Sequence, residues 1–350
     1  MKKQVTIGFI LLGLSASLLL MDACKKKDTA PVNTFNPTYI SLKIPAGWPT
    51  PPLDIYANNR LTEEGFQLGK KLFYDGRLSK DGNFPCASCH QQFAAFATYD
   101  HDFSHGFNNA FTFRNAPVTF NMAWMPLLHW DGGVNHIEVQ PLGPITAPNE
   151  MAETIDSVLY KLKAANEYKT MFKAAFGDEE INSQRMLKAL AQFMGSIISA
   201  NSKYDKVKRG EDNFTPVELS GYNIFKAKCD ACHKEPLFTD NSFRNNGLAL
   251  NSLSDRGRMR ITGNRNDSLK FKVPTLRNIS LTFPYMHDGR IYSLGQVIDH
   301  YRTGIITSQP TLDPLLVNRI VLTNAEKNDL VYFLYTLTDT EFTSNPRFAQ

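Results

Sequence analysis

The residues best placed to do chemistry are two cysteines and a histidine that occur twice in the same order. They form two Cys-x-x-Cys-His motifs, made of Cys86, Cys89 and His90 and of Cys229, Cys232 and His233. In this spacing, two thiols can add to the vinyl groups of a porphyrin while the following histidine binds the iron. The sequence therefore predicts two covalently bound haem c groups on one chain.

Two other uses of paired cysteines compete with this interpretation. A tetrahedral zinc site also uses Cys-x-x-Cys pairs, but zinc would not explain a histidine directly after the second cysteine in both copies. A disulfide within each pair could form in an oxidising compartment. Apart from Cys24, the four remaining cysteines all lie in the two motifs, so none is left for a structural disulfide elsewhere.

The ligand on the open side of each iron decides between electron transfer and catalysis. Several side chains that could bind iron lie within reach along the sequence. Near the first motif they are His101, His105, His129 and His136, and near the second they are Met259, Met286, His287, His300 and Tyr301.

Helices must position these motifs, and similar segments precede both of them. "LTEEGFQLGKKLF" at 61–73 and "FTPVELSGYNIFKAK" at 214–228 each have a threonine cap, early acidic residues and a G-x-x-[L/I]-F ending. Helical spacing also recurs over 186–198 and 330–337. This internal repeat predicts two domains of one ancestral kind.

Long irregular segments separate the predicted helices. Residues 99–150 and 236–292 are rich in Gly, Pro and Asn and show weak periodicity. Such segments in a helical protein are usually functional or wrap around something. The sequence predicts a mainly α fold without an extensive sheet.

The N-terminus has the layout of a secretory signal. Lys2 and Lys3 precede an apolar run over 5–20, and Cys24 follows a small residue, as in a lipoprotein signal. We expect a signal peptide over 1–23, a lipid anchor on Cys24 and a proline-rich tether over 24–55. The formal charge of +4 on 350 residues is small, which argues against nucleic-acid binding.

Beyond these patterns, the sequence resembles the diheme bacterial cytochrome c peroxidase and MauG family over nearly all of residues 55–340. The resemblance rests on "LGKKLFYDGRLS", "CASCH", "RNAPVTFN", "HWDGGVNHIEVQ", "PITAPNEM", "CDACH" and "VPTLRNISLTFPYMHDGR", in that order. It implies two cytochrome-c-like domains with long haem-wrapping loops, expected over 56–205 and 206–342. The first haem would be peroxidatic and the second would transfer electrons.

The resemblance also implies roles for individual residues. Trp130 matches the tryptophan between the haems, Gln140 a glutamine at the peroxide site, and Glu150 the distal acid. His105 matches the switchable ligand of the first haem, with His101 as the alternative. Tyr301 falls at the distal position of the second haem, where His300 or Met286 are the alternatives. Asn115 and the carbonyls of Thr282 and Pro284 match a calcium site.

The expected function is reduction of hydrogen peroxide to water with electrons from a small c-type cytochrome or similar donor. One alternative is a MauG-like oxidase that acts on a protein or organic substrate through a high-valent diheme state. A plain electron-transfer cytochrome is the third hypothesis, although it would have no use for a distal acid. The protein is expected on the periplasmic side of a bacterial membrane, lipid-anchored or secreted, and a homodimer is left open.

Overall fold

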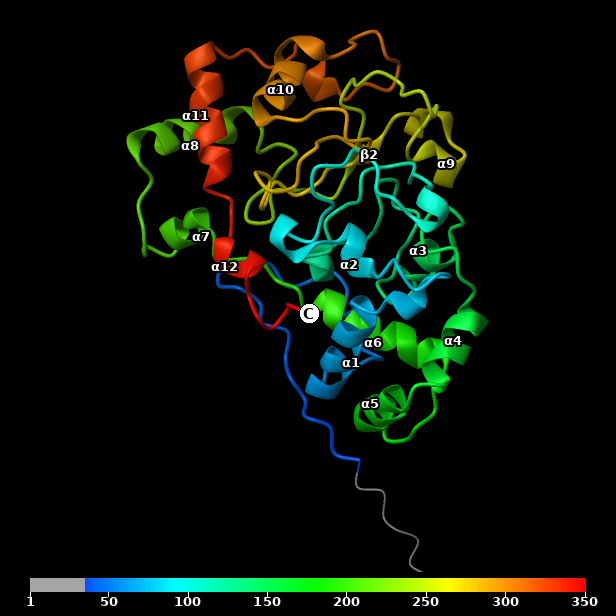
Figure 1. Ribbon diagram of the computed structural model, residues 1–350. Helices are drawn as coiled ribbons and strands as arrows, with labels where there is room; N and C mark the ends of the chain where they lie inside the picture. Colours follow the sequence, from blue (N-terminus) through cyan, green and yellow to red (C-terminus); the bar gives the residue numbers. More distant parts are fainter. Residues whose placement is uncertain (1–34) are drawn as a thin grey trace, which may run out of the picture. The chain divides into compact units, whose positions relative to one another are not determined.

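The computed structural model describes residues 35–350, and Asn36–Gln350 form one compact unit. The signal peptide, Cys24 and the start of the predicted tether lie outside the described residues. The α-helices run in chain order as α1 (Glu63–Phe73), α2 (Cys86–Cys89), α3 (Leu142–Thr146), α4 (Ile155–Lys163), α5 (Asn166–Phe176), α6 (Ser183–Gly195), α7 (Lys203–Lys208), α8 (Pro216–Lys228), α9 (Met259–Thr262), α10 (Leu294–Asp299), α11 (Asn324–Tyr335) and α12 (Thr340–Thr343) (Figure 1).

Little regular structure lies between these helices. The strands β1 (Phe243–Arg244) and β2 (Phe271–Lys272) pair antiparallel, with Phe243 opposite Lys272. Single turns of 3-10 helix occur at Gly76–Leu78, Gln92–Ala94, Phe107–Asn109, Met122–Trp124, Arg265–Asp267 and Pro314–Leu316, and one π-helical segment spans His300–Gly304. The described part is thus mostly helical with few strands, as predicted.

The two helices that precede the motifs form as their caps predict. Thr62 accepts a hydrogen bond from Gly65 N at the start of α1. Thr215 and Glu218 form a capping box at the start of α8, where a proline occupies the first turn. Thr323 and Glu326 form another capping box at the start of α11.

Each of these helices packs on one partner. α1 packs against α6, and α8 packs against α11, as seen in Figure 1 at the bottom and at the upper left. The buried apolar residues form two clusters accordingly. One draws mainly on residues 55–197 and the other on residues 204–337.

Two terminal segments depart from the predicted organisation. Residues 36–55, assigned to the tether, instead lie on the body: Ile55 is buried, and Trp124 Nε1 donates to the carbonyl of Pro49 at 2.8 Å. Trp48 packs edge-on against Trp124 at 5.0 Å. The proline-rich composition predicted an extended segment and gave no sign of these apolar contacts. At the other end, Phe342 and Phe348 join the first cluster rather than the second.

Candidate functional site

The first motif forms the short helix α2, and its histidine is held in a defined orientation. His90 Nδ1 lies 3.1 Å from the carbonyl of Phe96, to which it can donate, and this leaves Nε2 free for iron. Burial lowers the pKa of His90 to about 4, so the imidazole is neutral at physiological pH. A neutral imidazole is the form that binds a metal.

The second motif repeats this arrangement after α8. His233 Nδ1 lies 3.1 Å from the carbonyl of Phe238 and 3.2 Å from that of Pro274. Burial lowers the pKa of His233 as well. The four motif cysteines are free thiols, so neither motif forms the alternative disulfide. Within residues 35–350, no three or more His, Cys, Asp or Glu side chains gather in positions that could hold a metal ion.

Glu150 lies beside the first motif without a partner of its own. Burial raises the pKa of its carboxyl, and its negative charge in turn contributes to a raised pKa of the Cys89 thiol. No described residue donates a hydrogen bond to the carboxylate. By contrast, burial also acts on Glu153, but hydrogen bonds from Lys161 and the backbone outweigh it and lower the pKa.

The loop that carries His105 runs against the same acid. Phe107 N donates to the carbonyl of Glu150 at 2.7 Å, and a Cβ added to Gly106 would lie only 2.5 Å from that carbonyl oxygen. His105 itself is hydrogen-bonded through Nδ1 to Asn109 at 2.7 Å, and its ring centre lies 4.6 Å from that of Phe111 in a tilted contact. The structure therefore packs the loop that carries His105 against the backbone of Glu150.

The other histidines near the first motif differ in their surroundings. His101 is exposed, although its ring lies 5.4 Å from that of His105. His136 is also exposed. His129 lies close enough to His90 for its charge to lower the pKa of His90.

Trp130 connects the two halves of the chain through hydrogen bonds. Its Nε1 donates to the carbonyl of Asn115 at 2.8 Å, and its own carbonyl accepts from Lys272 N at 2.7 Å. Trp130 also lines a large cavity together with Cys229, Cys232 and His233. Gln140 is half-buried in the turn before α3, and its amide makes no hydrogen bond to described residues.

The same cavity contains two of the three distal candidates for the second haem. Tyr301 and Met286 line it, whereas His300 Nε2 is 3.0 Å from the carbonyl of Asn246. Burial raises the pKa of the Tyr301 phenol to about 12. Tyr301 lies in the π-helical segment after α10, a distortion that is frequent at functional sites.

Asn246 holds this group of residues together, and sequence reasoning missed it. Its Nδ2 lies 3.5 Å from Met286 Sδ, and its side chain also bonds Tyr301. Its carbonyl accepts from His300, which does not line the cavity, while its side chain contacts Met286 and Tyr301, which do. Asn246 belongs to an irregular segment, where no periodicity singles out any residue.

The predicted calcium ligands also line this cavity: Asn115, Thr282 and Pro284. Asn115 Nδ2 donates to the carbonyls of His101 and Asp102, at 3.1 and 3.3 Å, so its Oδ1 remains available as a ligand. No described backbone N–H donates to the carbonyls of Thr282 or Pro284. This set of free oxygens fits calcium.

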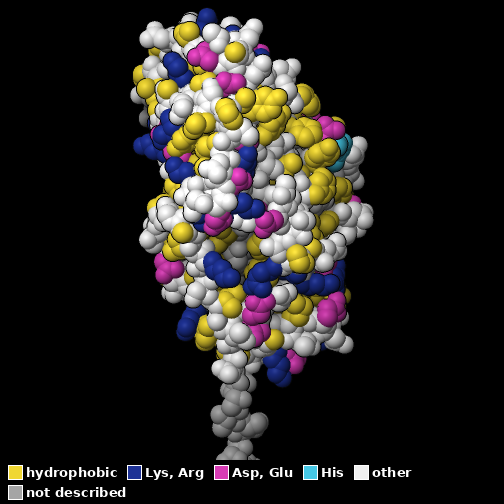
Figure 2. All heavy atoms as spheres, turned by 90° about the vertical axis from the view of Figure 1, so that its left-hand side faces the viewer, with side chains coloured by type: hydrophobic (Ala, Val, Ile, Leu, Met, Phe, Trp, Pro, Cys, Tyr) yellow, Lys and Arg dark blue, Asp and Glu magenta, His cyan; other side chains and the backbone are white. Residues whose placement is uncertain are grey.

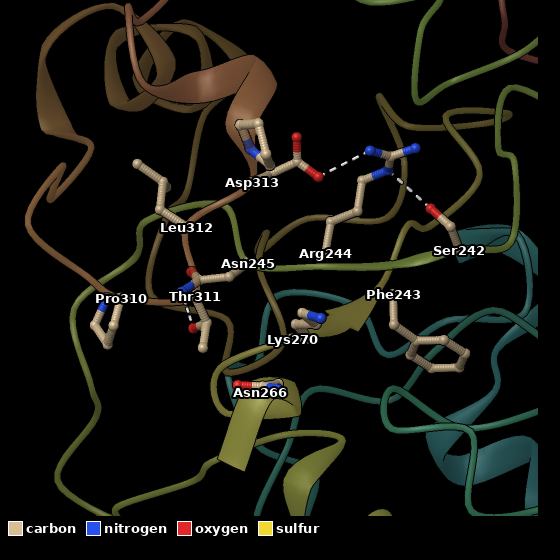
Figure 3. Close-up of a pocket in the computed structure, with 11 residues that line it drawn as sticks. Ser242, Phe243, Arg244, Asn245, Asn266, Lys270, Pro310, Thr311, Leu312 and Asp313 are labelled. Carbon is tan, nitrogen blue, oxygen red and sulfur yellow. Dashed lines mark hydrogen bonds and ion pairs between the residues drawn. The ribbon is translucent and has the colours of Figure 1, made fainter. Parts of the chain in front are cut away.

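A second, shallower cavity of about 510 Å³ lies beside the second motif (Figure 3). Arg244 lines both cavities, and its guanidinium pairs with Asp313 and Asp240 at 2.8 Å each. Figure 3 shows the pair with Asp313 and the bond to Ser242. The charged side chains of this pocket are therefore already ion-paired with each other or with neighbouring residues. We assign the pocket no ligand.

The surrounding surface carries no dominant charge of one sign on the face seen in Figure 2, where basic and acidic side chains are interspersed. No helix within residues 35–350 is long and apolar enough to cross a membrane.

Sequence comparisons place this geometry among known proteins. A sequence profile described as Di-haem cytochrome c peroxidase matches residues 63–213. The methylamine utilization protein MauG of Methylorubrum extorquens is 36% identical over 289 residues, covering 80% of this chain and 79% of that protein. The cytochrome c551 peroxidase of Nitrosomonas europaea is 36% identical over 277 residues, covering 78% of this chain and 79% of that protein.

Solved structures agree with these relatives. A MauG-like protein associated with microbial copper homeostasis is 34% identical, with a TM-score of 0.81 over 89% of this chain and 99% of that chain. The diheme peroxidase BthA from Burkholderia thailandensis shares the fold at a TM-score of 0.70 and 22% identity, covering 85% of this chain and 92% of that chain.

Proposed function

Because the chain belongs to the di-haem cytochrome c peroxidase family, we propose that it reduces hydrogen peroxide to water with electrons from a small c-type cytochrome or similar redox protein. Covalently bound haem c supplies the redox and peroxide-binding chemistry. The observation that carries the proposal is the Glu150 carboxylate, half-buried and without a hydrogen-bond partner, next to Cys89 of the first motif.

In this proposal Glu150 transfers a proton during cleavage of the peroxide. Peroxide takes up two electrons and two protons to give two waters, and cleavage of its O–O bond needs a proton moved from the inner to the outer oxygen. A carboxylate can accept that proton and return it. Its raised pKa brings proton gain and release closer to neutral pH. Gln140 orients the peroxide through its free amide.

His233 would hold the second haem, which would supply electrons to this site. Trp130 would bridge the two sites, a role supported by its place in the wall of the cavity of the second motif and by the hydrogen bond from Lys272 N to its carbonyl. His105 would be a displaceable ligand of the first iron. Its loop lies against Glu150, so movement of His105 would open the space that this acid faces.

Replacement of the distal acid tests the proposal. Glu150→Gln should keep both haems but lose peroxide turnover by roughly 10²- to 10⁴-fold, the usual contribution of a general acid–base group. Glu138→Gln, which removes an acid from the same segment, is the matched control and should behave as the unmodified protein. Full turnover in Glu150→Gln, with haem content unchanged, would show that another group moves the proton.

A MauG-like oxidation of a protein or organic substrate is the second candidate. The observation that favours it is Tyr301 in the cavity of the second motif, because an anionic phenolate would stabilise ferric iron and lower its potential. A haem that is harder to reduce suits oxidation of another substrate better than acceptance of electrons from a donor.

Three further features complete the proposal. The carbonyls of Thr282 and Pro284 and the side chain of Asn115 would hold a calcium ion, which is supported by the free oxygens that line one cavity. The N-terminal pattern supports export to the periplasmic side of a bacterial membrane and a lipid anchor on Cys24. Two haem domains over 56–205 and 206–342 are supported by the two apolar clusters.

A further inference from the structure

Lys272, the last residue of β2, is a buried cation without an acidic partner in the described part of the chain. It is 9% exposed. Its Nζ donates to the carbonyl of Leu127 at 2.9 Å and lies 3.8 Å from Met125 Sδ. No carboxylate of residues 35–350 lies within 4.0 Å of this ammonium. Both of its contacts are therefore neutral.

This environment differs from that of the buried Arg277 and the half-buried Arg114. Arg277 pairs with Asp205 at 2.8 Å, and Arg114 pairs with Asp131 at 2.7 Å and Asp255 at 2.6 Å. Burial of an ammonium costs free energy unless an anion is near. Burial lowers the pKa of Lys272 to about 8, against the opposing but weaker effect of the more distant Asp131 charge, so Lys272 remains largely charged at neutral pH. An ammonium has three N–H donors, and only one of those on Lys272 has a strong acceptor.

The cavity that Lys272 lines indicates where the missing anion comes from. Cys229, Cys232 and His233 line the same cavity, and Trp130 lies next to Lys272 in it. A haem c fixed to these cysteines brings carboxylates with it, since each porphyrin carries propionate groups. Within the described residues the cavity wall offers no carboxylate of its own to Lys272.

We propose that Lys272 binds a propionate carboxylate of a haem held in this cavity and so fixes the edge of the cofactor beside Trp130. The backbone N–H of Lys272 also donates to the carbonyl of Trp130 at 2.7 Å. One residue thus holds both the bridging tryptophan and the cofactor. The inference rests on haem binding and is independent of whether peroxide is the substrate.

The test separates the charge of Lys272 from its packing. Lys272→Met keeps most of the side-chain volume and the backbone hydrogen bond to Trp130, while Lys272→Arg keeps the charge. Lys270→Met is the matched control, because Lys270 is a nearby lysine that pairs with Asp267 at 3.3 Å. The three variants of the full holoprotein are compared with the unmodified protein by potentiometric titration and by resonance Raman spectroscopy of the propionate bending modes.

Loss of the cation leaves the propionate charge uncompensated, which stabilises ferric iron. Lys272→Met should therefore lower the midpoint potential of one haem and shift a propionate mode, with two haems retained. Lys272→Arg and Lys270→Met should match the unmodified protein. An unchanged potential and unchanged propionate modes in Lys272→Met would overturn the proposal.

A measurement on the unmodified holoprotein keeps the proposal testable if Lys272→Met does not fold. Its crystal structure should place a propionate oxygen within about 3.2 Å of Lys272 Nζ, the range of a hydrogen bond. A propionate directed elsewhere, with only water or backbone around Nζ, would contradict it.

Discussion

Glu150 and Glu153 show how environment decides the role of two acids on one turn. Glu153 is ion-paired with Lys161 and its pKa is lowered, which is the behaviour of a structural carboxylate. Glu150 is half-buried next to the first motif without such a partner, and desolvation raises its pKa. A carboxyl with a raised pKa beside a reactive centre is a candidate for proton transfer.

The raised pKa of Glu150 predicts how peroxide turnover depends on pH. The ionised carboxylate must accept the proton, so turnover should fall as pH drops through the pKa of Glu150. This acid limb should lie above the ordinary carboxyl value of about 4.3. Rate constants measured across pH should show it in the unmodified protein, and Glu150→Gln should lack it. A limb at or below the ordinary value would mean that Glu150 does not control turnover.

The same group predicts an effect on stability. Because the folded-state pKa is raised, the fold favours the protonated acid; stability is full below the unfolded pKa and declines as pH rises through the folded pKa. At pH 7, Glu150→Gln should therefore melt at the same temperature as the unmodified holoprotein or higher. Calorimetry of both proteins tests this, and a lower melting temperature for the variant would indicate an unseen partner of the carboxylate.

Tyr301 is the residue that separates the two proposed functions. If it binds the second iron, Tyr301→Phe should change the low-temperature magnetic resonance spectrum of that haem and raise its potential. Met286 lines the same cavity and would be the replacement ligand. A spectrum typical of histidine–methionine ligation in the unmodified protein, or an unaltered spectrum in Tyr301→Phe, would show that Tyr301 is not the ligand. The peroxidase function would then be favoured over the MauG-like one.

At the scale of elements, the repeated G-x-x-[L/I]-F ending has a structural reason. Gly69 of α1 and Gly221 of α8 occupy equivalent places in the two segments. A Cβ on Gly69 would lie 1.9 Å from the carbonyl oxygen of Ala189 in α6, and one on Gly221 would lie 2.0 Å from that of Asp329 in α11. Each helix before a motif therefore touches its partner backbone to backbone.

This close contact predicts that adding a single methyl group at either glycine lowers the stability of the fold. Gly69→Ala and Gly221→Ala should each lower the free energy of unfolding by roughly 1–3 kcal/mol, because backbone must move to admit the Cβ. Gly295→Ala is the control, since its nearest neighbour is the flexible end of Lys327 at 3.4 Å. Thermal or chemical unfolding measures all three; equal stability of Gly221→Ala and Gly295→Ala would contradict the close packing.

Helix starts were predictable because they depend on local chemistry. The caps at Thr215 and Thr323 are confirmed, since threonine and the acid three residues later lie within one turn. The contacts of Asn246 and Lys272 were not predictable, because they join irregular segments far apart in the chain. The packing of residues 36–55 on the body was not predicted for the same reason. Its apolar side chains, such as Trp48, contact residues beyond position 120.

At the scale of the whole molecule, the repeat predicts two haems that load separately. Haem quantified against protein after denaturation should give a ratio near two. Cys229→Ser should lose haem from the second site alone, because the first motif belongs to the other apolar cluster and its histidine is held by its own carbonyl partner. A colourless native protein loaded with zinc would reject haem attachment altogether.

The most direct test of the peroxidase assignment is the stoichiometry of the catalysed reaction. Reduced small c-type cytochrome and hydrogen peroxide are mixed with the holoprotein, and oxidation of the donor and loss of peroxide are followed together. We expect two donor molecules oxidised for each peroxide consumed, with the reaction abolished in a Cys86→Ser variant that lacks the first haem. Peroxide loss without donor oxidation, or the same rates in Cys86→Ser, would contradict the peroxidase assignment.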